Sequence, residues 1–486
     1  MSLGQRAIRG VMWSAAEKWG AQLFSTIVFL LLARLLGPET FGLVALAHVF
    51  LAFMQIFLDQ GFAQAIIQRD ELEPEHLDTA FWTSVLMGAL FSVTVFIGAG
   101  LVANFYDEPQ LAPIIRWLSF GFVFGGMSSV QAAILKRNMQ FKVFAIRTII
   151  ATAVCGIAGV GAALAGLGVW SLVIKELVYS LMGALLLWSI SDWRPGFRFS
   201  SKHFNELFSF GINIVGSNFL NFFNRRSDDM LIGYFLGPVA LGYYSVAYRL
   251  LLIMIQLLTN ITAQVALPTF SRMQKEPERL RNAFYKVTKY TSLISFPAFL
   301  GMAVLAPELV QVLFGEQWMP SIPVMRILAF GGILQSVYQF NGTILLSIGK
   351  PAWKLGLQCL NATCNIITFL LLVQWGIIFV ATGFVIRGYL LSPLPLLLIK
   401  KFIRIDLRIY LQQFLPPLSY SVLMAASIFA FQYLVRGWTL NSALLLALNI
   451  VVGCLSYALV IALISPNLIK EILRNFHPKT ASPESK

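Results

Sequence analysis

The residues best suited to chemistry in this sequence are polar side chains on one face of an otherwise apolar segment. They recur every three or four residues, which is the spacing of one helix face: Asn213, Ser217, Asn221, Asn224 and Asp228. A lipid bilayer offers such groups no hydrogen-bond partners. The pattern therefore predicts that this face meets water or another polar helix.

Charged residues inside apolar segments form a second group of candidates, because a charge within a bilayer is costly and usually functional. Arg225 and Arg226 come four and three residues before Asp229, so ion pairs can partly neutralise this turn. Together the polar and charged residues predict an aqueous central cavity, to which other apolar segments add Ser14, Glu17, Lys18, Gln22, Ser25, His48, Gln55, Lys175, Glu176, Arg249 and Arg387.

Structural roles fit several of these residues equally well. Glu17, Lys18, Asp228 and Asp229 also suit helix ends that reach the membrane interface. The adjacent opposite charges of Lys175 and Glu176 favour a packing or lobe-closing role over substrate contact. His48 alone is more typical of a hydrogen-bonded core histidine than of a proton relay.

The elements that must position these residues are transmembrane helices. The chain is 58% hydrophobic and 12% charged, whereas soluble proteins have about 25% charged residues. This excludes a soluble multidomain protein, a disordered chain and a disulfide scaffold. Runs long enough to cross a bilayer predict fourteen spans: 13–34, 41–57, 79–103, 111–135, 148–165, 169–189, 207–224, 241–267, 287–305, 327–348, 357–374, 377–399, 415–434 and 442–464.

The basic residues predict the orientation of these spans. If the N-terminus is cytoplasmic, most of the 36 lysines and arginines lie on the cytoplasmic side. The opposite side then carries only Arg34, Arg116, Arg326 and Arg436. Both termini are therefore expected in the cytoplasm. The net charge of +14 reflects these loops, and we expect no nucleic-acid partner.

Two motifs recur at a nearly constant distance. Leu36-Gly-Pro with Gly42 returns as Leu236-Gly-Pro with Gly242. Pro113-x-x-Arg-x-Leu-x-Phe returns from Pro323, and the extra residues of the second copy are expected in a long loop at 268–286. Helix ends often carry Gly and Pro, but two ordered matches favour a parallel repeat of two six-helix lobes, which is a transporter architecture.

Other functional signals are missing from the sequence. It contains no P-loop for ATP hydrolysis and no catalytic cluster, and no segment is long enough for a catalytic domain. Calcium-loop spacing is absent from the acidic run between Arg69 and Glu75, so we expect a solvated loop there and no metal site. The four cysteines lie in apolar runs and are expected to be buried, without a disulfide: Cys155, Cys359, Cys364 and Cys454.

Four stretches carry a family resemblance: SLGQRAIRGVMWS at 2–14, LARLLGPETFGL at 32–43, LDQGFAQAIIQ at 58–68, and DMLIGYFLGPVALGYYSVAYR at 229–249. They resemble the Wzx-type polysaccharide flippases of the multidrug/oligosaccharidyl-lipid/polysaccharide superfamily. The likeness is greatest to the colanic-acid and teichuronic-acid exporters.

The resemblance implies an all-α membrane protein of the bacterial inner membrane. It would have two six-helix lobes in a V, at 1–203 and 204–406, followed by a helix pair and tail at 407–486. The implied function is to move undecaprenyl-pyrophosphate-linked oligosaccharide to the periplasmic leaflet. The partners would be this substrate, membrane lipids, and the polysaccharide polymerase and export machinery, and the protein would be a monomer.

The resemblance also assigns roles to the candidate residues. Cavity cations would hold the pyrophosphate, to which arginine is well suited: Arg225, Arg226, Arg249 and Lys18. Burial and changing partners can shift the pKa of a carboxylate between two states, so the candidate coupling or gating carboxylates are Glu17, Asp228, Asp229 and Glu176. Alternating access would be driven by a proton or sodium gradient, without a cofactor. The alternatives are a drug/cation antiporter of the same superfamily, a membrane glycosyltransferase or polysaccharide polymerase, and an uncoupled lipid scramblase.

Overall fold

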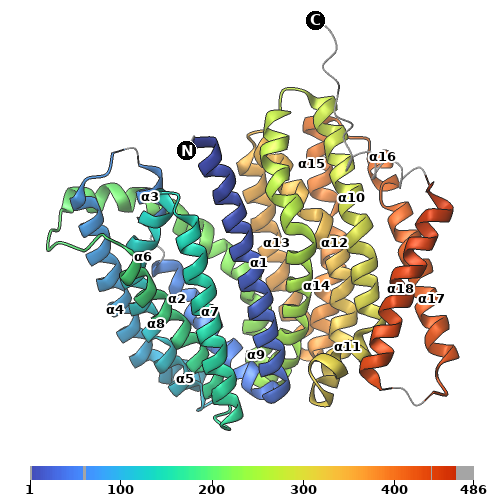
Figure 1. Ribbon diagram of the computed structural model, residues 1–486, viewed down its shortest axis with the longest axis horizontal. Helices are drawn as coiled ribbons and strands as arrows, with labels where there is room; N and C mark the ends of the chain where they lie inside the picture. Colours follow the sequence, from blue (N-terminus) through green and yellow to red (C-terminus); the bar gives the residue numbers. More distant parts are fainter. Residues whose placement is uncertain (1–2, 59–61, 70, 439–440, 467–486) are drawn as a thin grey trace, which may run out of the picture. The chain divides into compact units, whose positions relative to one another are not determined.

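The computed structural model describes residues 3–58, 62–69, 71–438 and 441–466, and every regular element in these ranges is helical (Figure 1). The α-helices are α1 Leu3–Leu35, α2 Pro38–Leu58, α3 Phe62–Gln68, α4 Pro74–Phe105, α5 Leu111–Leu118, α6 Phe120–Arg137, α7 Phe141–Leu164, α8 Trp170–Ile190, α9 Ser201–Arg272, α10 Pro277–Val304, α11 Ala306–Leu313, α12 Ile322–Ser347, α13 Pro351–Leu372, α14 Ile377–Leu391, α15 Pro393–Ile403, α16 Leu407–Gln412, α17 Leu415–Leu434 and α18 Ser442–Ile464. The 3₁₀ helices are η1 Glu316–Ser321 and η2 Val373–Trp375.

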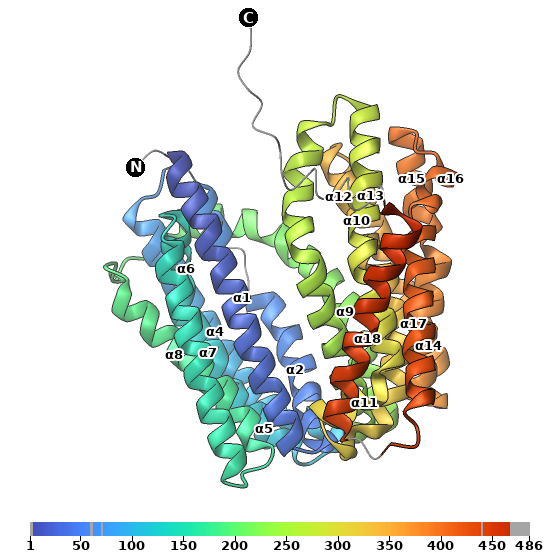
Figure 2. The same ribbon diagram turned by 45° about the vertical axis from the view of Figure 1, so that its right-hand side comes forward.

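The helices form two compact units. One comprises Met1–Val246 with Gln358–Val380, and the other comprises Ala247–Leu357 with Ala381–Lys486. In the first unit α7 packs against α1 and α8, and α4 packs against α6. In the second, α10 packs against α12 and α17, and α18 lies beside α17 (Figure 2). The lobe boundaries at 203 and 406 differ from the limits of these units and remain a prediction.

All fourteen apolar runs found in the sequence lie in helices to within one residue at their ends, and the runs 111–135, 357–374 and 377–399 each cover two consecutive helices. Among the described residues, eleven helices are long and apolar enough to cross a membrane, or twelve if the bent pair α10 and α11 counts as one span. Within α1, the segment Trp19–Leu35 is a shorter apolar helix. The protein is thus a multi-pass helical membrane protein, and fourteen spans remain a prediction.

The seventh and eighth predicted spans are joined in α9, whose 72 residues include one non-helical position. Gly237 has φ 78° and ψ 179°, a left-handed value that favours glycine. The chain therefore turns at the second Leu-Gly-Pro motif. At the first motif it turns between α1 and α2, where Pro38 is the first residue of α2, a position at which proline loses no helical hydrogen bond.

Two expectations from the sequence were wrong. The long loop at 268–286 does not exist, because α9 continues to Arg272 and α10 starts at Pro277. Polar residues extend these helices, and Arg279 and Glu276 form an ion pair at 3.5 Å. Of the cysteines, which are all free, only Cys155 is buried, and Cys454 is exposed on α18, since an apolar run also supplies lipid-facing positions.

Candidate functional site

The two Leu-Gly-Pro motifs meet each other in the first unit. A Cβ atom added to Gly42 would lie 1.7 Å from the carbonyl oxygen of Pro238, and one added to Gly242 would lie 1.9 Å from that of Pro38. The contacts are reciprocal, so the start of α2 and the part of α9 after Gly237 cross with local two-fold symmetry. Such backbone contact requires glycine on both sides. This geometry supports the internal repeat inferred from the sequence.

A pair of buried carboxylates lies in α9 just before this crossing. Asp228 and Asp229 are 4% and 7% exposed. The hydroxyl of Tyr244, from beyond the Gly237 turn, donates a hydrogen bond of 2.9 Å to Oδ2 of Asp228. Nη1 of Arg226 lies 3.0 Å from Oδ2 of Asp229. Of the two ion pairs predicted from helical spacing, that of Arg226 with Asp229 is confirmed. The described residues show none between Arg225 and Asp229, because Arg225 lies on an exposed position of the helix.

Aromatic rings lie close to this acidic turn. Phe105 and Tyr234 pack with their centroids 4.7 Å apart. Burial raises the pKa of the neighbouring Tyr106 to about 12, and the negative charge of Asp229 contributes. Tyr106 therefore stays a neutral phenol at physiological pH. The two carboxylates are buried, with Tyr244 hydrogen-bonded to Asp228 and Tyr106 close enough to feel the charge of Asp229.

The candidate cations differ in their surroundings. The side chain of Arg226 is 41% exposed, and its charge is offset by Asp229. Arg225 is exposed on the neighbouring position of the same helix. Arg249 is also exposed and lies in the second unit. Within the first unit, Arg225 is therefore better suited than Arg226 to meet an anionic ligand.

The polar face of α9 does not behave as one uniform surface. Asn221 is exposed. Asn224 packs in the first unit, because Nδ2 of Asn365 on α13 donates to its Oδ1 at 2.8 Å and to its main-chain oxygen at 3.3 Å. The side chains of Asn213 and Ser217 lie outside the described residues. A structural hydrogen bond thus occupies one of the predicted cavity positions.

The other predicted polar residues are half-buried where their side chains are described. Gln22 donates to Thr26 at 3.4 Å, and Ser25 lies beside it. His48 and Gln55 are half-buried on α2. The side chains of Ser14, Glu17 and Lys18 lie outside the described residues.

Two further charged positions have local partners. Nζ of Lys175 lies 2.6 Å from Oε1 of Glu176, so each neutralises the other, which supports a packing role. Arg387, in the second unit, lies with its guanidinium 5.6 Å from the ring centroid of Phe384.

Sequence reasoning missed a cluster of histidines and acids in the first unit. Arg69, Glu73, His76, His203 and Glu206 lie together there. Arg69 holds the pKa of Glu206 below its ordinary value through a hydrogen-bonded ion pair. The members come from segments more than a hundred residues apart, and no local spacing could have brought them together.

A multi-pass helical membrane protein with a buried acidic turn and exposed arginines is a candidate carrier. The chain belongs to the polysaccharide biosynthesis protein family, whose model matches residues 31–323.

One relative extends this match over nearly the whole chain. The teichuronic acid biosynthesis protein TuaB of Bacillus subtilis is 25% identical over 97% of this chain and 99% of its own length. The lipopolysaccharide biosynthesis protein WzxC of Escherichia coli is 30% identical over 71% of each chain.

Solved structures show the same fold. The lipid II flippase MurJ, in an inward closed conformation, has a TM-score of 0.77 over 94% of this chain and 100% of its own, at 14% identity. An inward-facing multidrug resistance MATE transporter has a TM-score of 0.65 over 80% of this chain and 98% of its own, at 15% identity.

Proposed function

We propose that this protein is a flippase that moves lipid-linked oligosaccharide across a bacterial inner membrane for the synthesis of a surface polysaccharide. The observation that carries the proposal is the match along nearly the whole chain to a teichuronic acid biosynthesis protein. The lipid-flippase fold supports it. The substrate is an isoprenoid carrier, undecaprenyl pyrophosphate, bearing a polysaccharide repeat unit. The protein acts as a transporter and not as an enzyme.

In this proposal, fourteen spans form two six-helix lobes and a terminal pair, with both termini in the cytoplasm. The lobes at 1–203 and 204–406 alternate between inward-open and outward-open states, driven by a proton or sodium gradient. The Gly42–Pro238 and Gly242–Pro38 contacts join these lobes on the expected periplasmic side. They must separate when the cavity opens outward.

The candidate residues have separate roles in this proposal. Arg225 meets the pyrophosphate, because it is exposed and guanidinium binds phosphate oxygens in a bidentate manner. Asp228 and Asp229 are the coupling carboxylates, since both are buried in the turn before the crossing. Membrane lipids surround the protein, which acts as a monomer and passes its product to the polymerase and export machinery.

Deletion of the gene tests the function itself. We expect surface polysaccharide to disappear and lipid-linked repeat units to accumulate in the inner leaflet, because synthesis continues without export. A plasmid copy of the gene should restore the surface polysaccharide and remove the accumulated lipid-linked units. Undiminished polysaccharide in the deletion strain would contradict the proposal.

Arg225→Ala is expected to weaken the apparent affinity for lipid-linked oligosaccharide at least about tenfold, because a hydrogen bond to a charged group contributes about 1.5–3 kcal/mol. The affinity of Arg225→Lys should lie between those of the wild type and Arg225→Ala, since lysine keeps the charge and loses the planar guanidinium. Substrate binding to the purified variants measures this. Unchanged affinity in Arg225→Ala would remove this residue from the site.

Arg226→Ala makes a contrasting control. It leaves the buried carboxylate of Asp229 without its ion-pair partner, so its main effect should be a lower thermal stability. The pair of variants thus separates ligand binding from folding.

A drug/cation antiporter is the second candidate, because the MATE fold also matches. Growth with cationic drugs distinguishes the two, since an antiporter would confer resistance and a polysaccharide flippase would not.

A further inference from the structure

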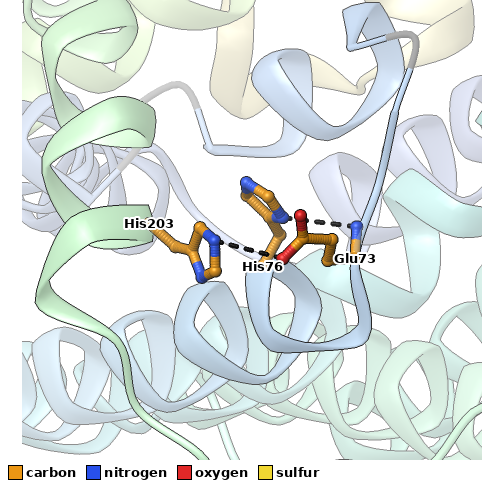
Figure 3. A group of neighbouring side chains, drawn as sticks. All are labelled: Glu73, His76 and His203. Carbon is orange, nitrogen blue, oxygen red and sulfur yellow. Dashed lines mark hydrogen bonds and ion pairs between the residues drawn. The ribbon is translucent and has the colours of Figure 1, made fainter.

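Two buried histidines and a glutamate face one another where α4 and α9 begin (Figure 3). His76 is the third residue of α4 and His203 the third residue of α9. They are 4% and 6% exposed, and their ring centroids lie 3.9 Å apart. Glu73 precedes α4, and one ligand atom from each of the three residues lies within 4.8 Å of the others.

The spacing of these atoms suits a transition metal. Nε2 of His203 lies 3.4 Å from Oε2 of Glu73. Two ligands about 2.0–2.1 Å from a tetrahedral Zn²⁺ lie about 3.3 Å apart. Figure 3 shows His76 with its Nδ1 turned toward Glu73, whose main-chain N–H donates to it at 3.3 Å. A metal would compete with this hydrogen bond for the Nδ1 lone pair.

The outer nitrogen of His76 has the partner that a metal-bound histidine usually has. Its Nε2 lies 3.4 Å from Oε2 of Glu206. Arg69 forms an ion pair with the same carboxylate and also contacts Nε2 itself. A metal-ligating imidazole typically donates its other N–H to a carboxylate, which fixes the ring and strengthens the ligand. Glu206 supplies the carboxylate for this outer contact. Arg69 can only donate, so it must turn from Nε2 to this carboxylate when the imidazole binds a metal.

The second ring nitrogen of His203 faces another carboxylate. This nitrogen, Nδ1, is buried and has no hydrogen-bond partner among the described residues, and the nearest carboxylate, that of Glu75, lies 3.8 Å away. A buried polar atom without a partner is costly. A small movement of the ring would bring Nδ1 within hydrogen-bond distance of Glu75, which would be an outer carboxylate contact of the kind that orients a metal-bound histidine.

The surroundings hold the two helix starts in place. The segment before α9 is hydrogen-bonded to α4, since Gly196 donates to Asp78 at 2.9 Å and Ser200 donates to Thr79 at 3.1 Å. Trp82 donates to the carbonyl of Gly196 at 2.8 Å. The ligands therefore come from elements already joined, as a preorganised metal site requires.

We propose that Glu73, His76 and His203 bind a divalent transition-metal ion of the zinc type, which fastens the start of α9 to the start of α4. Two imidazoles and one carboxylate favour zinc over calcium or magnesium, which prefer oxygen ligands. Water fills the remaining coordination position. The sequence predicted no metal here, because His203 lies far along the chain from the acidic loop.

The test uses the full-length protein purified in detergent with a tag that contains no histidine. After dialysis against a chelator, we expect the protein to bind one equivalent of Zn²⁺ by calorimetric titration and to melt at a higher temperature with zinc than without it. Co²⁺ in place of zinc should give the visible absorption of a tetrahedral site. Absence of a tight equivalent in the wild-type protein would overturn the proposal.

Variants identify the ligands. His203→Gln and Glu73→Gln are expected to weaken zinc binding by more than about 100-fold, since changes beyond the ligands alone cost about 10–100-fold. Glu71→Gln is the matched control, an exposed glutamate of the same loop, and should bind zinc as the wild type does. Equal zinc affinity of His203→Gln and the wild type would also overturn the proposal. If His203→Gln fails to fold, zinc binding by His76→Gln replaces it as the test. Unchanged zinc affinity in that variant, or a cobalt spectrum of the wild type without the tetrahedral absorption, would then overturn the proposal. Transport is not measured, so the outcome is independent of the flippase proposal.

Discussion

Replacing Gly42 with alanine is expected to lower polysaccharide export more than tenfold. The new Cβ would lie 1.7 Å from the carbonyl oxygen of Pro238, whereas ordinary contacts begin at 3.4 Å. Backbone cannot yield as a side chain does, so α2 and α9 must move apart. Overpacking of this kind costs about 1–3 kcal/mol or more. The two helices can then no longer form the close contact that the proposed inward-open state requires, and the transport cycle stops.

Gly242→Ala should have the same effect, because it meets Pro38 in the reciprocal contact. Gly98→Ala is the matched control, since nothing lies within 4 Å of an added Cβ at that position. Surface polysaccharide is measured at equal protein levels in the membrane. Normal export by Gly42→Ala would show that this crossing does not open and close during transport.

Asp228→Asn is expected to abolish export that depends on an ion gradient, with the protein still folded. The amide keeps the size of the side chain and can still accept the hydrogen bond of Tyr244, but it cannot take up a proton and has no negative charge to balance a bound cation. A buried charge of this kind in a membrane helix is usually functional. Gradient-dependent uptake in vesicles and thermal stability are the two measurements.

Asp192→Asn serves as the comparison, because Asp192 is an exposed acid of the first unit. Tyr244→Phe should lower stability by about 1.5–3 kcal/mol, since it removes a hydrogen bond to a charged group. Full gradient coupling in Asp228→Asn would exclude this carboxylate from the coupling step.

The sequence predicted the helices well because lipid imposes a simple rule. Each apolar run had to become a helix, and 442–464 agrees with α18 to the residue. The loop at 268–286 was mispredicted, because hydropathy marks where a helix leaves the membrane and not where it ends. The extension consists of polar residues, among them the exposed pair Arg279 and Glu276, which a hydropathy criterion does not count as helix.

The candidate site was predictable only where its parts are close in sequence. The Arg226–Asp229 pair follows from helical spacing. The hydrogen bond from Tyr244 to Asp228 crosses the turn at Gly237, and its geometry depends on that turn. The repeat was visible as two Leu-Gly-Pro motifs, but their mutual contact requires a three-dimensional arrangement that pattern alone does not provide.

The central claim is most directly tested by reconstituting the purified protein in liposomes that hold a fluorescent lipid-linked oligosaccharide. A membrane-impermeant reagent then measures how much substrate has crossed. We predict crossing that accelerates with an imposed proton or sodium gradient and stops when an ionophore dissipates it. Substrate that stays in its original leaflet under every gradient, in vesicles where the protein is folded, would contradict the account.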